Sequence, residues 1–103
     1  MIKHKFNAKQ ANDSQGIKYS SKLERNHAER LILLQKAGDV LFFLRQVPFH
    51  LPGGVTYRAD FMVFWKNGDC TIEECKGLDL PMGKLKRAQV EELYPVTIKV
   101  ITA

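Results

Sequence analysis

Residues 57–77 read YRADFMVFWKNGDCTIEECKG, in which two segments rich in aromatic and β-branched residues flank a KNG turn. This pattern predicts a β-hairpin. The two strands are expected at residues 57–65 and 69–76. Three charged residues nevertheless lie within them: Asp60 in the first strand, and Glu74 and Lys76 in the second. Because a buried charge is costly unless it is paired or bound, these side chains are the first candidates for a functional site.

The register of this hairpin depends on the length of its turn. A two-residue NG turn would place Asp60 opposite Cys75, and the two acids would then lie on different faces. A three-residue KNG turn, with Gly68 in the left-handed conformation, would place Asp60 opposite Glu74. The sequence tolerates both turns. We predict the three-residue turn because it gathers the charged side chains on one face.

Two carboxylates that face each other in a sheet repel, and a divalent cation between them would reverse this effect. Mg²⁺ prefers oxygen ligands and is usually held by only one or two carboxylates. Asp60 and Glu74 fit this description, the backbone carbonyl of Cys75 is a further candidate ligand, and Mn²⁺ is expected to substitute for Mg²⁺. Lys76 could orient an attacking water or steady a phosphate. A solvated ladder of ion pairs explains the same spacing about equally well.

The segment SSKLERNHAERLILLQKAG, residues 20–38, predicts a helix that begins at a serine N-cap and ends at a glycine. On a helical wheel Glu24 lies within the apolar stripe, whereas Glu29 points to solvent. A capping role and a functional role explain Glu24 equally well. His27 lies on the same stripe and is interpreted as a packing residue.

The remaining segments complete an α/β pattern. Strands are expected at residues 40–51 and 96–102, and a second helix at residues 83–94. The first of these strands should bend near Pro48. Residues 1–19 are basic and lack periodicity, so we expect a flexible arm before a single domain at residues 20–103. The predicted fold class is α/β, with a central mixed sheet of about four strands flanked by helices.

Composition limits the classes of partner. The 103 residues include 16 Lys and Arg against 11 Asp and Glu, a net charge of +5, which favours a polyanion such as DNA. No apolar run is long enough to span a membrane, so no membrane contact is expected. Cys70 and Cys75 lie five positions apart on one predicted strand and cannot form a disulfide, which favours a reducing cytoplasm. No small-molecule cofactor is expected.

Several basic residues are candidates for contacts with phosphate groups. They are Arg58 on the first hairpin strand, Lys84, Lys86 and Arg87 at the start of the second helix, and Lys3 and Lys5 in the arm. The alternative for each is a solvated charge that aids solubility. The sequence contains no evident cluster of base-reading side chains on a recognition helix. Structure-directed or nonspecific recognition of nucleic acid is therefore favoured over sequence-specific recognition.

The order of these motifs resembles the PD-(D/E)XK nuclease superfamily. YRAD followed at hairpin distance by IEECKG is similar to its motif of an acid on one strand and E-x-K on the next, with Ala59 in place of the usual proline. SKLE at residues 21–24 resembles the acidic helix of small phage-type endonucleases, including Holliday-junction resolving enzymes. The resemblance covers most of residues 20–95 and implies a restriction-endonuclease-like domain.

The resemblance also implies an activity, namely Mg²⁺-dependent hydrolysis of DNA phosphodiester bonds. The implied catalytic residues are Glu24, Asp60, Glu74 and Lys76, and the implied cation ligands are Asp60, Glu74, Glu24 and the carbonyl of Cys75. A branched substrate would need two cuts, and a homodimer would follow. A phage-encoded enzyme would act in the host cytoplasm. The alternatives are a non-catalytic nucleic-acid-binding module on the same fold and a protein-interaction domain whose charge is incidental.

Overall fold

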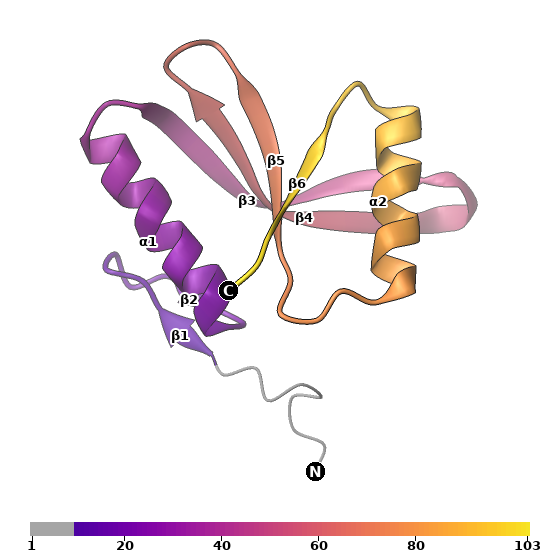
Figure 1. The fold of residues 1–103 in the computed structure, drawn as a ribbon, viewed down its shortest axis with the longest axis horizontal. Coiled ribbons are helices and arrows are strands. Elements are labelled where there is room, and N and C mark those ends of the chain that lie inside the picture. The colour runs from indigo at the N-terminus through magenta and orange to yellow at the C-terminus, as the bar shows by residue number, and fades with distance from the viewer. Residues whose placement is uncertain (1–9) are drawn as a thin grey trace.

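The computed structural model describes residues 10–103, which form a four-stranded mixed sheet, a two-stranded ribbon and two α-helices (Figure 1). The sheet consists of β3 (Val40–Leu51), β4 (Val55–Trp65), β5 (Cys70–Cys75) and β6 (Ile98–Ile101), in that order. The first three strands are antiparallel neighbours, and β6 joins β5 in parallel. This arrangement confirms the predicted α/β class with a mixed sheet of four strands and two helices.

Each helix covers a different part of the sheet and closes its own hydrophobic core. Helix α1 (Lys22–Lys36) packs Ala28 and Leu31 against Phe61 and Val63, and α2 (Pro81–Leu93) contributes Val90 to a second core. Figure 1 shows the two helices on opposite sides of the central strands. A loop of five residues, 76–80, leads the chain from the central strand β5 to α2.

Strand β4 takes part in both cores and changes from one to the other at Asp60. On the C-terminal side of Asp60, Phe61 and Val63 belong to the α1 core. On its N-terminal side, Tyr57 and Ala59 belong to the α2 core. Asp60 therefore lies where the two cores meet, which is the position from which a side chain can reach a cleft between the two helices.

Strand β3, the neighbour of β4, likewise passes from the α1 core to the α2 core, and it does so at Gln46. In the β3–β4 register Arg45 pairs with Phe61 and Val47 with Ala59, so Gln46 lies opposite Asp60, yet these two residues are not paired. Gln46 has a φ of 53°, in the left-handed region. The irregularity predicted near Pro48 lies two residues earlier, at Gln46, whereas Pro48 itself pairs regularly with Arg58. A further register shift lies between Val40 and Phe42.

The helix ends follow the sequence signals. The Ser21 side chain caps α1 by accepting the backbone N–H of Glu24 at 3.1 Å, and Gly38 follows the helix with a φ of 89°. Helix α2 begins at Pro81, two residues before the predicted start, because proline suits the first helical turn. Neither helix of residues 10–103 is long and apolar enough to cross a membrane.

The segment before α1 differs from the predicted flexible arm. Strands β1 (Ala11–Asn12) and β2 (Lys18–Tyr19) pair with each other, and the Tyr19 ring is buried in the α1 core. The buried carboxylate of Asp13 accepts the Tyr19 hydroxyl at 3.0 Å. The folded structure therefore begins before the predicted boundary at residue 20. Residues 1–9, which include Lys3 and Lys5, lie outside the described residues.

Candidate active site

The turn between β4 and β5 has the three residues that the sequence analysis favoured. Trp65 N–H donates to the Asp69 carbonyl at 2.9 Å, and Gly68 closes the turn with a φ of 95°. The ladder then runs from Phe64 opposite Cys70 to Phe61 opposite Glu73. The next position in this register is Asp60 opposite Glu74. The predicted register is confirmed, and the alternative that places Asp60 opposite Cys75 is excluded.

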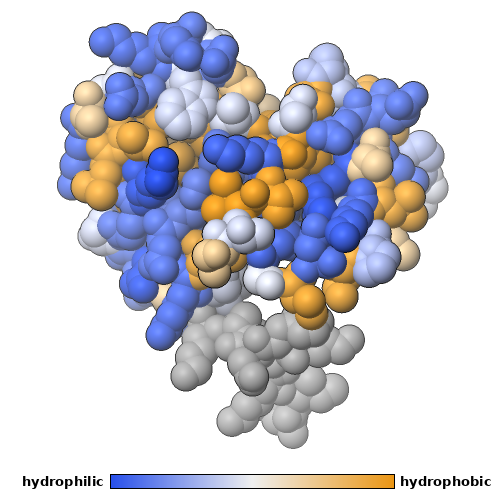
Figure 2. Space-filling view, viewed as in Figure 1, coloured by the Kyte–Doolittle hydropathy of each residue, from blue (hydrophilic) through white to orange (hydrophobic). Residues whose placement is uncertain are grey.

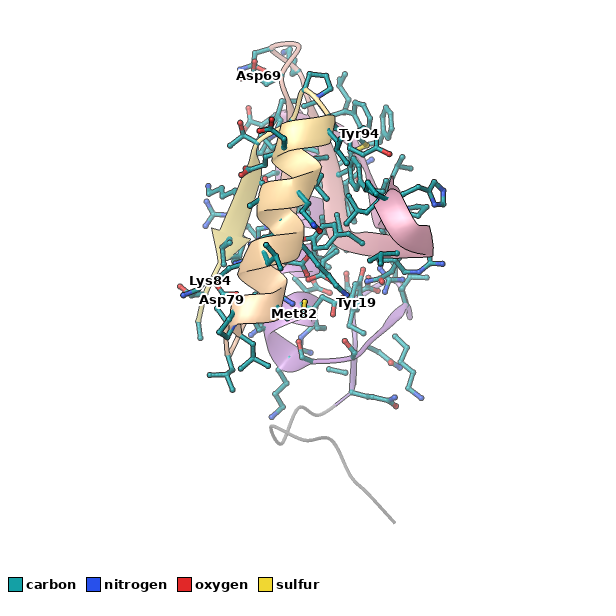
Figure 3. The ribbon with its side chains drawn as sticks, turned by 90° about the vertical axis from the view of Figure 1, so that its right-hand side faces the viewer. Tyr19, Asp69, Asp79, Met82, Lys84 and Tyr94 are labelled. Atoms are coloured by element: carbon teal, nitrogen blue, oxygen red, sulfur yellow. The ribbon has the colours of Figure 1, made fainter. Side chains whose placement is uncertain are left out.

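The four predicted catalytic residues line one cleft of about 670 Å³ between the two helices. Glu24 comes from the first turn of α1, Asp60 from β4, and Glu74 and Lys76 from the end of β5 and the position after it. The opposite wall is the loop after β5 and the first turn of α2. Figure 3 shows Asp79, Met82 and Lys84 at this end of α2, with Tyr94 at the other end. The exposed side chains of Leu78, Leu80 and Met82 make this wall apolar. Further apolar surface lies in the middle of the face seen in Figure 2, where β6 crosses in Figure 1.

Asp60 is a buried acid whose pKa is strongly raised. Its side chain is held by the Cys75 N–H, which donates to Oδ2 at 2.8 Å, and by Nε2 of Gln46, which donates to Oδ1 at 3.3 Å. Burial, and then the neighbouring carboxylate of Glu74, raise the pKa of Asp60 to about 7. Without a cation, Asp60 therefore carries only part of its charge near neutral pH.

Glu74 is 4% exposed and is fixed from one side by a tyrosine. The Tyr57 hydroxyl donates to Glu74 Oε2, and Lys76 Nζ lies 3.9 Å from Glu74 Oε1. Burial and this hydrogen bond raise the pKa of Tyr57, so its hydroxyl stays protonated and remains a donor. Oε1 is thus the Glu74 oxygen that faces the lysine and is left for other ligands.

Glu24 serves the helix cap and the cleft with different atoms. Its backbone N–H satisfies the Ser21 cap, while its buried carboxylate accepts the Ser20 hydroxyl at 2.8 Å and Nε2 of Gln46 at 3.3 Å. Burial, and then the charge of Asp60, raise the pKa of Glu24. The two interpretations that the sequence left open are therefore compatible, because capping leaves the carboxylate free to face the cleft.

Two acids close to these residues in sequence lie elsewhere. Glu73 points to the α1 face, where His27 Nε2 lies 2.5 Å from Glu73 Oε1 and the Thr71 hydroxyl donates to Oε2 at 2.7 Å. Although burial opposes it, these hydrogen bonds lower the pKa of Glu73. The interpretation of His27 as a packing residue is supported by its edge-on contact with Phe61. Glu29 accepts the Ser14 N–H and does not line the cleft.

The predicted phosphate contacts are only partly accessible. Arg87 is 7% exposed, and its Nη2 pairs with both carboxylate oxygens of Asp79 at 2.7–2.8 Å. It therefore holds the loop before α2, and its contact with phosphate stays a prediction that its burial does not favour. Lys84 is exposed beside Gly83 of the cleft wall, and Lys86 is half-buried. Arg58 is exposed on β4 but does not line the cleft.

Gln46 and Tyr57 are site residues that the sequence analysis did not identify. Each donates to a carboxylate of the cleft from a strand position that looks ordinary in the sequence. Tyrosine is common in strands, so Tyr57 gives no signal of its own. The only available signal for Gln46 was a polar amide in the middle of an apolar strand, and its contacts depend on a backbone conformation that no pattern predicts.

The donor groups suit a hard cation such as Mg²⁺. The Cys75 N–H donates to Asp60, and the N–H and C=O of a strand residue lie on the same side of the strand, so the Cys75 carbonyl is expected on the β4 side of β5. Burial, and then Asp60, raise the pKa of the Cys75 thiol to about 12, so the thiol is protonated at neutral pH when no cation is bound. No three His, Cys, Asp or Glu side chains of residues 10–103 form a group that could hold a metal ion. A cation here would need water and substrate oxygens as well, which is usual for Mg²⁺.

Comparisons of the chain with protein-family models, with curated proteins and with solved structures gave no match. The function assigned to the cleft therefore depends on its geometry and on the chemistry of its residues.

Proposed function

We propose that this protein is a metal-dependent endonuclease of the PD-(D/E)XK type that hydrolyses DNA phosphodiester bonds. The observation that carries the proposal is the convergence of Glu24, Asp60, Glu74 and Lys76 on one cleft, from three separate elements. The order of the elements, an acidic helix followed by a hairpin with D and E-x-K, supports a restriction-endonuclease-like domain. A solvated ladder of ion pairs does not account for acids that are 4–9% exposed.

The carboxylates of Asp60 and Glu74 and the carbonyl of Cys75 would hold Mg²⁺, or Mn²⁺ in its place, with Glu24 at the edge of the site. When bound, the cation would supply a Lewis acid that neutralises charge on the phosphate and activates water. Tyr57 orients Glu74, and the Cys75 N–H orients Asp60. Lys76 places a cationic Nζ next to Glu74 at the cleft, where it can stabilise negative charge that develops on the phosphate.

DNA is the proposed substrate because the chain carries a net charge of +5 and the exposed Lys84 borders the cleft. We expect the enzyme to recognise branched structure or to cut nonspecifically. A homodimer would suit a branched substrate, because paired cuts require two active sites. The cleft wall formed by Leu78, Leu80 and Met82 offers no hydrogen-bonding side chains for reading base edges.

Cleavage of defined substrates tests this proposal. The full chain would be incubated with supercoiled plasmid, linear duplex and a four-way junction, with Mg²⁺, with Mn²⁺ and with EDTA. We expect cleavage with either metal and none with EDTA. Asp60→Asn and Lys76→Ala should each reduce the rate by at least about 100-fold while leaving the protein folded.

Glu29→Gln is the matched control, because Glu29 is an acid of the same helix as Glu24 but lies away from the cleft. It should cleave at the wild-type rate, whereas Glu24→Gln should be impaired. DNA binding without metal-dependent cleavage of any substrate would contradict the proposal and favour a non-catalytic binding module. Absence of both binding and cleavage would favour a protein-interaction domain.

A further inference from the structure

Gln46 has an unusual backbone conformation next to the cleft. Among residues 10–103 it is the only non-glycine residue with a positive φ, and it lies in the middle of the twelve-residue strand β3. Residues with a side chain rarely adopt this conformation, and such residues are concentrated at functional sites. Here the conformation interrupts the pairing with Asp60 and brings the Gln46 side chain to the carboxylates.

The amide of Gln46 connects two of the acids. Its Nε2 lies 3.3 Å from Glu24 Oε1 and 3.3 Å from Asp60 Oδ1, and an amide nitrogen has two hydrogens to donate. The other oxygen of each acid already has a donor: Ser20 serves Glu24 Oε2, and the Cys75 N–H serves Asp60 Oδ2. The amide therefore occupies the position from which a cation would join Glu24 to Asp60.

On the side of Asp60 that faces Glu74, no amide bridges the two acids. Glu74 lies opposite Asp60 when the β4–β5 register is continued, and no hydrogen-bond donor among residues 10–103 serves both of these carboxylates. Lys76 Nζ lies 3.9 Å from Glu74 Oε1, but among the described residues no salt bridge joins a cation to Asp60, so this pair is the part of the cleft where a divalent cation fits. A carboxylate oxygen has two lone pairs, so Asp60 can accept from Gln46 and also bind a cation on the Glu74 side.

We propose that Gln46 restricts this centre to a single divalent cation, because its amide bridges Glu24 and Asp60 where a second cation would otherwise bind. The cation is held by Asp60 and Glu74, and Glu24 acts as a positioning residue through Gln46. This inference rests on the proposed metal site and defines its stoichiometry.

The number of Mn²⁺ ions bound by the full chain tests the inference without any cleavage. Free Mn²⁺ would be measured by electron paramagnetic resonance in a titration of metal-free protein, and wild type should bind one Mn²⁺ per chain. Gln46→Glu replaces the donor with a third carboxylate and should bind two. Gln46→Gly keeps the positive φ while removing the amide, and it should gain a second, weaker site. Gln89→Glu, an exposed position of α2, is the control and should bind one.

The outcomes separate this inference from the proposed function. Two Mn²⁺ ions in the wild type, or one ion in both Gln46 variants, would overturn the role of Gln46 while leaving a metal-dependent nuclease possible. No Mn²⁺ binding by the wild type would overturn both proposals. Thermal unfolding would show whether the variants are folded, and Gln46→Gly tests the inference if Gln46→Glu does not fold.

Discussion

Glu73 and Glu74 are neighbours in the chain, and the alternation of β5 sends their carboxylates to opposite faces of the sheet. Glu73 meets His27 beneath α1, with hydrogen-bond donors for both of its oxygens. Glu74 meets Asp60 in the cleft, where the two acids repel each other. At the scale of single residues, the same side chain is therefore structural at one position and a candidate ligand at the next.

We predict that Glu73→Gln and Glu74→Gln have opposite effects on stability and activity. Glu73→Gln removes the charge that the buried His27 faces, so it should lower the free energy of unfolding by about 1–3 kcal/mol without abolishing cleavage. Glu74→Gln removes a repulsive charge, so it should keep stability and lose cleavage. Urea unfolding would measure the stability of both variants, and plasmid cleavage would measure their activity. An inactive Glu73→Gln beside an active Glu74→Gln would place the catalytic acid on the α1 face.

Asp60 should also make stability depend on pH. Its pKa rises from 3.8 to about 7 on folding, so the folded state binds its proton more tightly than the unfolded state. The resulting stabilisation is complete below pH 3.8 and is lost as the pH rises through about 7. We predict that Asp60→Asn becomes progressively more stable than wild type across this interval. Urea unfolding in EDTA would measure the difference.

The comparison between Asp60→Asn and wild type cancels the contributions of other acids, such as Glu73, whose lowered pKa acts in the opposite direction. Saturating Mg²⁺ should remove most of the difference in the free energy of unfolding between Asp60→Asn and wild type, because a bound cation favours ionised Asp60. A difference that is constant from pH 4 to pH 8 in EDTA would contradict the burial and repulsion described for this site.

At the scale of elements, the three-residue turn between β4 and β5 determines whether the site exists. The side-chain alternation of a strand has a period of two, so a shift of one residue would move Asp60 or Glu74 to the other face. Gly68 supports the three-residue turn with a φ of 95°. No atom lies within 4 Å of the position that a Cβ would take there, so its requirement for glycine is purely conformational.

Gly68→Ala should therefore destabilise the protein by about 1–2 kcal/mol, the cost of a left-handed conformation for a residue with a Cβ. Gly77→Ala is the matched control, since Gly77 has no positive φ and no atom within 4 Å of its Cβ position. Thermal unfolding of the two variants would measure the difference. Equal midpoints would show that the turn does not require the left-handed conformation at residue 68.

Local patterns were sufficient to predict some of these elements. The turn sequence, the serine cap of α1 and the apolar stripe that contains Glu24 each depend on residues a few positions apart, and the structure agrees with them. The burial of Arg87 could not be predicted in this way, because its partner Asp79 lies eight residues away across a helix start. The packing of β2 and Tyr19 against α1 is likewise a tertiary effect that overrides a polar sequence.

Within the site, the contacts of Gln46 likewise could not be predicted from local sequence patterns. Its side chain was not a candidate because the ordinary alternation of a strand gives no reason for it to meet both an α1 acid and a β4 acid. The positive φ that makes this possible is stabilised only by the surrounding fold, where β3 passes from one core to the other.

At the scale of the whole molecule, the net charge of +5 has to be reconciled with a cleft that contains three acids. Without a cation the acids would repel a phosphate, so we expect that the proposed DNA substrate is attracted mainly by basic residues around the cleft, in addition to Lys76 within it. Lys84, in the first turn of α2, is exposed beside the cleft wall (Figure 3). Lys36 is exposed in the last turn of α1, at the end of that helix far from the cleft.

We predict that Lys84→Gln weakens DNA binding and reduces the slope of log K against log salt by about 1, the value for one phosphate contact. Lys36→Gln should leave this slope unchanged. Fluorescence anisotropy with a labelled junction in Ca²⁺, over a series of salt concentrations, would measure both. Equal slopes for wild type and Lys84→Gln would remove the first turn of α2 from the DNA-binding surface.

The most direct test of the proposed metal-dependent nuclease activity is cleavage of a four-way junction and a supercoiled plasmid by the full chain, with Mg²⁺ and with EDTA. Wild type and Glu73→Gln should cut in Mg²⁺ only, and Asp60→Asn and Glu74→Gln should not cut although they are folded and bind DNA. Cleavage by wild type that persists in EDTA, or cleavage by Asp60→Asn and Glu74→Gln at the wild-type rate, would contradict a metal-dependent site at these two acids.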